Sequence, residues 1–430
     1  MYSSTYCTSD ILLQTKKDNM LEIARNSRII TLNGQQYYHV SNGSNDGAGK
    51  YFTLQGDEVE YSSISPESLT EDTFDLFTKT GAKLDTVEEI SKYLKRYIYL
   101  TSEAEYTLIS LLTIHSYGVD LFERTPYLWI KGVKGSGKTT LMTIMKFLVY
   151  NPEFLSDTTA AALFRLLDNR PTLFLDEVEA LNKRNSGNEL IFRVLNSGYQ
   201  KDGTVTRTIK NEPIIFNTYG FKVLAGINSL APALQDRCIP LTLTKPNETF
   251  ELETFSAKDS GTISSLISLI HSSLRKNCPD LVKYKNDPEL LAINSKIRLR
   301  EFDKWFPLLA LAKTLSSKTN NYFKHIQDYA LGVISQKEQA EAFQPENICR
   351  DIVKDFIADN SSKALATEKK HFLFRTDEIQ KVILANDQHN TYRGKGEITI
   401  ILKTIGVETT RKRFGNGPVS LYRIPKSLLV

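Results

Sequence analysis

One eight-residue run constrains the fold more than any other part of the chain. Residues 132–139 read Gly-Val-Lys-Gly-Ser-Gly-Lys-Thr, which fits the pattern Gly-x4-Gly-Lys-Ser/Thr. A loop of this pattern joins a β-strand to an α-helix. The apolar run 127–130 precedes it, and a helical pattern at 139–145 follows it. The run therefore predicts an α/β fold, in which helices cover both faces of a parallel sheet.

The composition of this loop indicates phosphate binding. Glycines at 132, 135 and 137 let the backbone N–H groups point inward at phosphates. Lys138 would supply a cation for the β- and γ-phosphates of ATP, and Thr139 would place its hydroxyl on Mg²⁺. A chance glycine-rich turn is the alternative, but a pattern that spans eight positions in the right context disfavours it. The residues expected to bind the nucleotide are Gly132, Val133, Lys134, Gly135, Ser136, Gly137, Lys138, Thr139 and Thr140.

A second element strengthens this interpretation. The apolar run 171–175 ends in two carboxylates, Asp176 and Glu177, which is the Walker B pattern. Asp176 would hold Mg²⁺, and Glu177 would orient and polarise the attacking water. Adjacent acids are common at strand ends, so this pair alone would be weak evidence. Together with the glycine-rich loop that precedes it, the pair is strong evidence for a nucleotide site.

Four further stretches resemble one group of ATPases. They are 106–117, 126–128, 216–222 and 305–312, and they look like AAA+ ATPases of phages, plasmids and chromosomal islands. That group includes the MCM-like replicative helicases of staphylococcal cassette chromosomes and pathogenicity islands. The resemblance covers roughly residues 98 to 315 and implies an AAA+ core with a helical lid.

The resemblance also implies roles for three residues outside the loop. Asn228 ends an apolar run and is similar to sensor 1, which lies between the two acids and reaches the γ-phosphate or the lytic water. Arg237 resembles an arginine finger that reaches the site of a neighbouring subunit; a surface salt bridge with Asp236 is the alternative. Arg300 resembles sensor 2, with Arg298 as the competing choice.

The stretch 202–216 predicts a hairpin, because alternating β-branched residues flank a Lys-Asn-Glu-Pro turn. The resemblance implies that such a hairpin projects a basic residue into the channel of a ring. Lys210 at the tip, helped by Lys201 and Arg207, would contact DNA phosphates. An edge hairpin with a solvated lysine is an equally weighted alternative.

Basic residues concentrate near the C-terminus. From Thr391 to Val430 there are eight Lys and Arg against two Glu, although the whole chain of 430 residues carries only +4. Helical patterns at 347–358, 376–384 and 396–405 precede strand-like runs at 407–414 and 419–424. Three helices and a two-stranded wing describe a winged helix. Arg411, Lys412 and Arg413 would contact DNA; winged helices also bind proteins.

Composition excludes other classes. The four cysteines and six histidines are scattered without paired spacing, which argues against a zinc site or a disulfide framework. No apolar run approaches the roughly 20 residues of a membrane span, so we expect a cytoplasmic protein without a membrane partner.

These observations predict five regions and one function. The expected regions are a small β-rich domain at 1–70, a helical lead-in at 71–122, the AAA+ core and lid at 123–315, a linker at 316–345 and a winged-helix DNA-binding domain at 346–430. We expect an ATP- and Mg²⁺-dependent DNA helicase or translocase of a mobile genetic element, acting in replication as a homo-oligomeric ring, expected to be a hexamer. Its partners would be single- and double-stranded DNA, further copies of the chain and other replication proteins of the element. The alternatives are an ATP-regulated DNA-binding initiator without unwinding activity and an ATP-driven protein remodeller.

Overall fold

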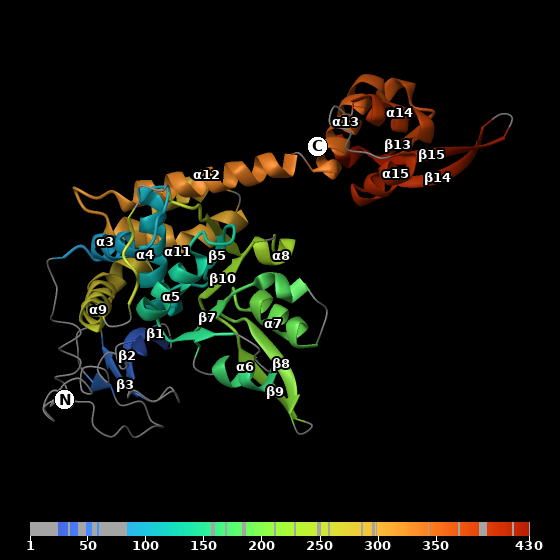
Figure 1. Ribbon diagram of the computed structural model, residues 1–430. Coiled ribbons are helices and arrows are strands. Elements are labelled where there is room, and N and C mark those ends of the chain that lie inside the picture. Colours follow the sequence, from blue (N-terminus) through green and yellow to red (C-terminus); the bar gives the residue numbers. More distant parts are fainter. Residues whose placement is uncertain are drawn as a thin grey trace, which may run out of the picture. The chain divides into compact units, whose positions relative to one another are not determined.

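The computed structural model divides into two compact units, residues 1–331 and 332–430 (Figure 1). The residues that it describes are 25–32, 35–41, 49–53, 58–59, 84–155, 160–167, 170–182, 186–209, 212–227, 229–246, 251–256, 259–284, 287–294, 297, 299–342, 344–368, 370–386, 394–414 and 417–429.

Five parallel strands form the central sheet of the first unit, in the order β11-β5-β10-β7-β6. Every residue of β7 and β10 is buried, as expected for strands that helices cover on both faces. The predicted α/β class with a parallel sheet is thereby confirmed, and it is consistent with a P-loop-like core. The strand bounds are β5 Tyr127–Lys131, β6 Pro152–Phe154, β7 Thr172–Leu175, β10 Lys222–Gly226 and β11 Cys238–Thr242.

Helices of the first unit surround this sheet (Figure 1). The predicted lead-in helices are present as α3 and α4, and α4 begins with a capping box in which Ser102 and Glu105 bind each other's backbone N–H groups. Nearly all of α4 is buried, as expected for a helix whose apolar residues are not confined to one face. The bounds are α3 Thr86–Tyr97, α4 Glu103–Tyr117, α5 Lys138–Leu148, α6 Ala160–Leu167, α7 Ser186–Ser197, α8 Pro232–Gln235, α9 Ser260–Lys283, α10 Pro288–Asn294 and α11 Leu299–Leu315.

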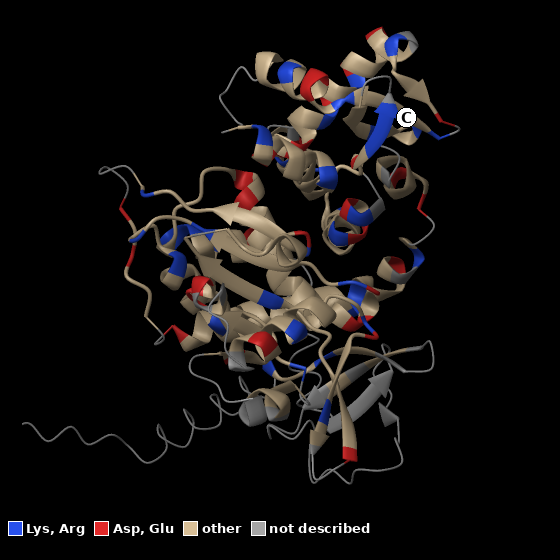
Figure 2. Ribbon diagram, turned by 90° about the vertical axis from the view of Figure 1, so that its right-hand side faces the viewer, with Lys and Arg blue, Asp and Glu red and all other residues tan. Residues whose placement is uncertain are grey.

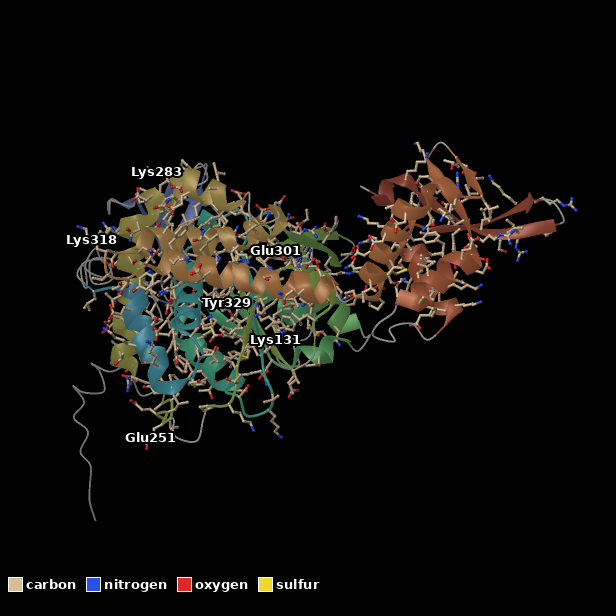
Figure 3. All side chains as sticks on the ribbon, turned by 90° about the horizontal axis from the view of Figure 1, so that it is seen from above. Lys131, Glu251, Lys283, Glu301, Lys318 and Tyr329 are labelled. Carbon is tan, nitrogen blue, oxygen red and sulfur yellow. The ribbon has the colours of Figure 1, made fainter. Side chains whose placement is uncertain are left out.

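A helix occupies most of the expected linker. Helix α12 spans Tyr322–Ala342 and crosses the boundary between the two units. Its first half packs on the first unit, where Ile326 and Ala330 are buried and the Tyr329 hydroxyl, labelled in Figure 3, donates to the Pro240 carbonyl at 2.9 Å. These long-range contacts stabilise a helix that the local sequence pattern does not predict. The stretch expected to be a linker, 316–345, is therefore largely helical.

Two smaller β-structures complete the first unit. One is a four-stranded antiparallel sheet in the order β1-β2-β3-β4, within the region expected to be β-rich. The predicted hairpin is also present: β8 pairs with β9 from Thr204↔Asn217 to Ile209↔Glu212. The bounds are β1 Arg28–Leu32, β2 Gln35–Ser41, β3 Gly49–Thr53, β4 Glu58–Val59, β8 Thr204–Ile209 and β9 Glu212–Asn217.

The second unit contains the three helices and two strands that the sequence predicts. Two further short strands are present, so the sheet has the order β12-β13-β15-β14. Phe374, Ile383, Leu402 and Tyr422 pack in its hydrophobic core. The bounds are α13 Pro345–Asn360, β12 Ala366–Thr367, β13 His371–Arg375, α14 Thr376–Asn386, α15 Lys395–Thr404, β14 Glu408–Phe414 and β15 Gly417–Pro425.

None of the described helices combines the length and the apolar character that a membrane span requires.

Candidate nucleotide site and basic surfaces

Three strands of the parallel sheet end side by side. The register pairs Gly226 of β10 with Lys131 of β5, and Leu224 of β10 with Leu175 of β7. Since parallel strands point the same way, the segments that follow them leave from one edge of the sheet. The loop that begins at Gly132 and the acids that begin at Asp176 therefore meet at this edge.

Backbone conformation fixes the shape of the loop. Gly135 and Gly137 have φ angles of +79° and +94°, values that favour glycine. Gly137 is also the N-cap of α5, and a Cβ placed on it would lie 2.7 Å from the Ile98 Cδ1 atom. The conformation of residue 137 therefore favours glycine, and a larger residue there would also displace the end of the Ile98 side chain.

The side chain of Lys138 lies over the loop. Its Nζ donates to the carbonyls of Gly132 and Val133 at 2.6 and 3.1 Å. Both acceptors belong to the loop itself, so the ammonium is held close to the backbone N–H groups of the loop rather than extended into solvent. Thr139 and Thr140 follow in the first turn of α5.

The two acids reach the same edge. The Thr139 hydroxyl donates to Asp176 Oδ2 at 3.5 Å, and the Glu177 backbone N–H donates to Asp176 Oδ1 at 2.8 Å. Both acid side chains are exposed. Glu177 has a φ of +50°, a left-handed conformation that costs a non-glycine residue roughly 1–2 kcal/mol. Such strain is typical of functional sites, and here it turns the chain directly after Asp176.

Sequence reasoning missed a third carboxylate at this edge. Glu179 Oε1 accepts a hydrogen bond from the Ile227 backbone N–H. A Cβ on Gly226 would lie 2.8 Å from the same oxygen, so a larger residue at this position would displace the Glu179 side chain. Glu179 therefore ties the end of β10 to the segment after Glu177. The sequence shows an acid two positions after Glu177, but it does not reveal the contact, because the partner Ile227 lies far along the chain. The adjoining Asn228 lies outside the described residues.

The arginine candidates lie near one another. Arg237 donates from Nε to the Asn196 carbonyl at 3.0 Å and from Nη1 to the Ala233 carbonyl. Arg300, whose side chain is 79% exposed, places Nη1 4.0 Å from Asp236 Oδ2. The Asp236 carboxylate thus pairs with Arg300, and the Arg237 guanidinium caps backbone carbonyls of its own chain. Arg298 lies outside the described residues.

Two of the three residues expected to contact DNA at the hairpin have partners within the chain. Lys201 Nζ donates to the Asp120 carbonyl at 2.6 Å, and the Arg207 guanidinium lies 5.3 Å from the centroid of the Phe164 ring. Lys210, at the turn, lies outside the described residues.

The three basic residues of β14 divide between two faces of the sheet. Part of β14 is blue in Figure 2. Lys412 Nζ binds Glu368 at 2.6 Å, whereas the Arg411 and Arg413 side chains are exposed. Because alternate strand residues share a face, Arg411 and Arg413 lie on the opposite face from Lys412.

Helix α15 covers the face to which Arg411 and Arg413 belong. Thr409 precedes them on that face and pairs with Tyr422. The Tyr422 hydroxyl is 2.8 Å from the Thr399 hydroxyl of α15. The two exposed arginines and α15 therefore lie on one side of the second unit.

Comparisons with known proteins give a limited result. No protein-family model matches the chain, and no curated protein matches it either. The solved structures that it matches include one described as "SCCmec type IV Cch - active helicase", with a TM-score of 0.38 and 15% sequence identity, covering 94% of this chain and 80% of that one. A likeness of this size does not define the family or the activity of the chain.

Proposed function

We propose that this protein is a Mg²⁺-dependent ATPase of the AAA+ class. The observation that carries the proposal is the meeting of the loop 132–139 and the acids at one sheet edge, with Thr139 hydrogen-bonded to Asp176 at 3.5 Å. A hydroxyl and a carboxylate are ligands that suit Mg²⁺. The left-handed glycines and the nearby ammonium of Lys138 suit the phosphates. The donors at this edge therefore fit the nucleotide and the ion.

Each residue then has one task in hydrolysis. Lys138 exchanges its loop carbonyls for β- and γ-phosphate oxygens, and Glu177 accepts a proton from the water that it orients. Thr139 and Asp176 hold Mg²⁺, which supplies charge neutralisation at the phosphates when bound. Arg237 leaves its carbonyl acceptors for the site of a neighbouring subunit, which requires a ring, for which we propose a hexamer.

We further propose that hydrolysis drives movement along DNA or strand separation. The hairpin supports this, because β9 leads directly into β10. Strand β10 ends at the sheet edge where the loop 132–139 meets Asp176 and Glu177, which we call the nucleotide edge. Buried Lys222 of β10 donates to the carbonyls of Thr218 and Gly220, both at 2.9 Å. It also donates to the Gly198 carbonyl at 3.4 Å, and burial lowers the pKa of its amine to about 7. A shift at the end of β10 would therefore be transmitted to the base of the hairpin.

The second unit supports a DNA partner. We propose that this unit is a winged helix, with α15 as the recognition helix and β14 and β15 as the wing; its order of helices and strands supports this proposal. Two exposed arginines on the α15 side suit contacts with the phosphate backbone.

A strand-displacement assay tests this proposal. The protein is incubated with Mg²⁺, ATP and a forked DNA duplex, and release of the labelled strand is measured. We expect release that requires hydrolysis and is lost with a non-hydrolysable ATP analogue. DNA binding and ATP turnover without release would favour the initiator, and ATPase without DNA binding would favour the protein remodeller.

A further inference from the structure

The segment after β11 runs along the outer side of the phosphate loop. The Leu243 backbone N–H donates to the Lys131 carbonyl at 2.7 Å, which continues the pairing of β11 with β5 to the residue before the loop. A Cβ on Gly132 would lie 2.7 Å from the Leu243 carbonyl oxygen. The backbones of the two segments are therefore in direct contact.

Lys245 reaches the loop from this segment. Its Cε and Nζ atoms lie 3.7 and 4.0 Å from the position that a Cβ on Gly135 would take. Its side chain is exposed. Pro246 follows, which holds the backbone of Lys245 in an extended conformation. Within the part of the chain that the structure describes, the ammonium has no ion pair, although it lies next to a loop built for anions.

The position of Lys245 separates it from the reacting end of the nucleotide. Strand β11 flanks β5 on one side, and β10 and β7 lie on the other. Asp176 and Glu177 follow β7, so the acids that act on the γ-phosphate lie across the loop from Lys245. With the γ-phosphate on the side of these acids, a cation on the β11 side would face the part of the nucleotide that ATP and ADP share.

We propose that Lys245 is a second cation of the nucleotide site, which binds the shared part of ATP and ADP from the β11 side. This inference rests on the ATPase function proposed above. The contact acts on binding rather than on the chemical step, because it is the same before and after the γ-phosphate is cleaved. Nothing in the loop motif itself predicts it, since Lys245 lies over one hundred positions downstream.

Nucleotide binding by Lys245 variants tests the inference. The affinities of Mg²⁺·ATP and Mg²⁺·ADP are measured by calorimetry for the full chain, together with KM and kcat. We expect Lys245→Ala to weaken both affinities by a similar factor of about tenfold, the usual scale for a charge-assisted hydrogen bond. KM should rise far more than kcat falls. Lys245→Arg should recover most of the affinity, and Thr244→Ala, at the neighbouring exposed position, should match the wild type.

Lys138→Ala separates failure of this inference from failure of the ATPase proposal. If Lys138→Ala weakens binding and Lys245→Ala does not, Lys245 has no role and the ATPase proposal stands. If Lys245→Ala weakens ATP but not ADP, the contact is with the γ-phosphate and the inference is wrong. If the wild type binds neither nucleotide, both proposals fail. A loss of affinity that Lys245→Arg does not restore, accompanied by a lower melting temperature, would assign Lys245 a structural role and overturn the inference.

Discussion

The nucleotide edge and the wing strand β14 place their charged groups in different ways. At the nucleotide edge the backbone determines where the charged groups lie. The strand register aligns the segments, and the left-handed conformations of Gly135, Gly137 and Glu177 set the direction of the chain after each strand. On β14 the backbone is a regular strand, and the partners of the side chains determine which charges are exposed. Lys412 is paired with Glu368, whereas Arg411 and Arg413 are exposed. A sequence motif therefore predicts which segments meet at the first region. A basic cluster in the sequence does not predict which charges of the second region are exposed.

The largest expected effect tests the nucleotide edge. Lys138→Ala should lower hydrolysis at least about 100-fold and weaken nucleotide binding, since the β- and γ-phosphates lose the loop cation. Glu177→Gln should lower hydrolysis about as much but retain ATP, because it keeps the shape and loses only the group that accepts the proton. ATPase assays and equilibrium binding give both readouts. Lys324→Ala, in an exposed ion pair with Asp328, is the matched control.

Two outcomes would break this assignment. Near-normal ATP turnover by the Lys138→Ala protein would show that the loop is not part of the site. A Glu177→Gln protein that cannot retain ATP would make Glu177 structural, and its left-handed conformation would then need another explanation.

The next effect tests whether the nucleotide edge is complete within one chain. Arg237→Ala should lower ATPase activity at least about tenfold, because an arginine supplied in trans stabilises the charge of the transferring phosphoryl group. Mixing it with Lys138→Ala protein should restore part of the activity, since a mixed ring contains intact composite sites. ATPase is measured over a series of mixing ratios, with assembly checked by sedimentation. If assembled mixtures recover no activity at any ratio, the contacts of Arg237 with Asn196 and Ala233 are its whole role.

The contrast explains what could be predicted from sequence. The loop, the acids, the hairpin and the three C-terminal helices follow local rules of pattern and spacing, and their strands and helices were found where expected. Helix α12 was not, because its stability depends on contacts such as that of Tyr329 with Pro240. The partners of Glu179, Lys201 and Lys412 also come from distant parts of the chain. Sequence alone therefore predicts these strands and helices better than it distinguishes paired from unpaired charges.

A smaller effect sharpens the description of β14. Replacing both Arg411 and Arg413 with alanine should make the slope of log affinity against log salt shallower by up to roughly 1.8, since each phosphate contact contributes about 0.9. Lys412→Ala should change the slope little, because its amine is already bound to Glu368. Binding to a duplex is measured by fluorescence anisotropy at several salt concentrations. ATPase without DNA should stay unchanged, since β14 belongs to the other unit. Equal effects of all three residues would contradict the division between the two faces.

The smallest effect comes from removing the acid that holds Lys412. The side-chain hydrogen bonds of Lys412 and Arg423 lower the pKa of Glu368 below its ordinary value of 4.5. A lowered pKa in the fold means that the pairing stabilises above about pH 4.5 and is lost as pH falls through the lower value. Glu368→Gln should therefore remove this pH dependence from the second unit: hydrogen exchange of β14 amides should be faster than in the wild type above about pH 4.5 and similar to the wild type at low pH. It should also release Lys412 and steepen the salt slope of DNA binding by at most roughly 0.9. Glu378→Gln changes the net charge equally at an exposed position of α14, so a matching response in that variant would show that general electrostatics, rather than the Glu368 pair, controls this strand.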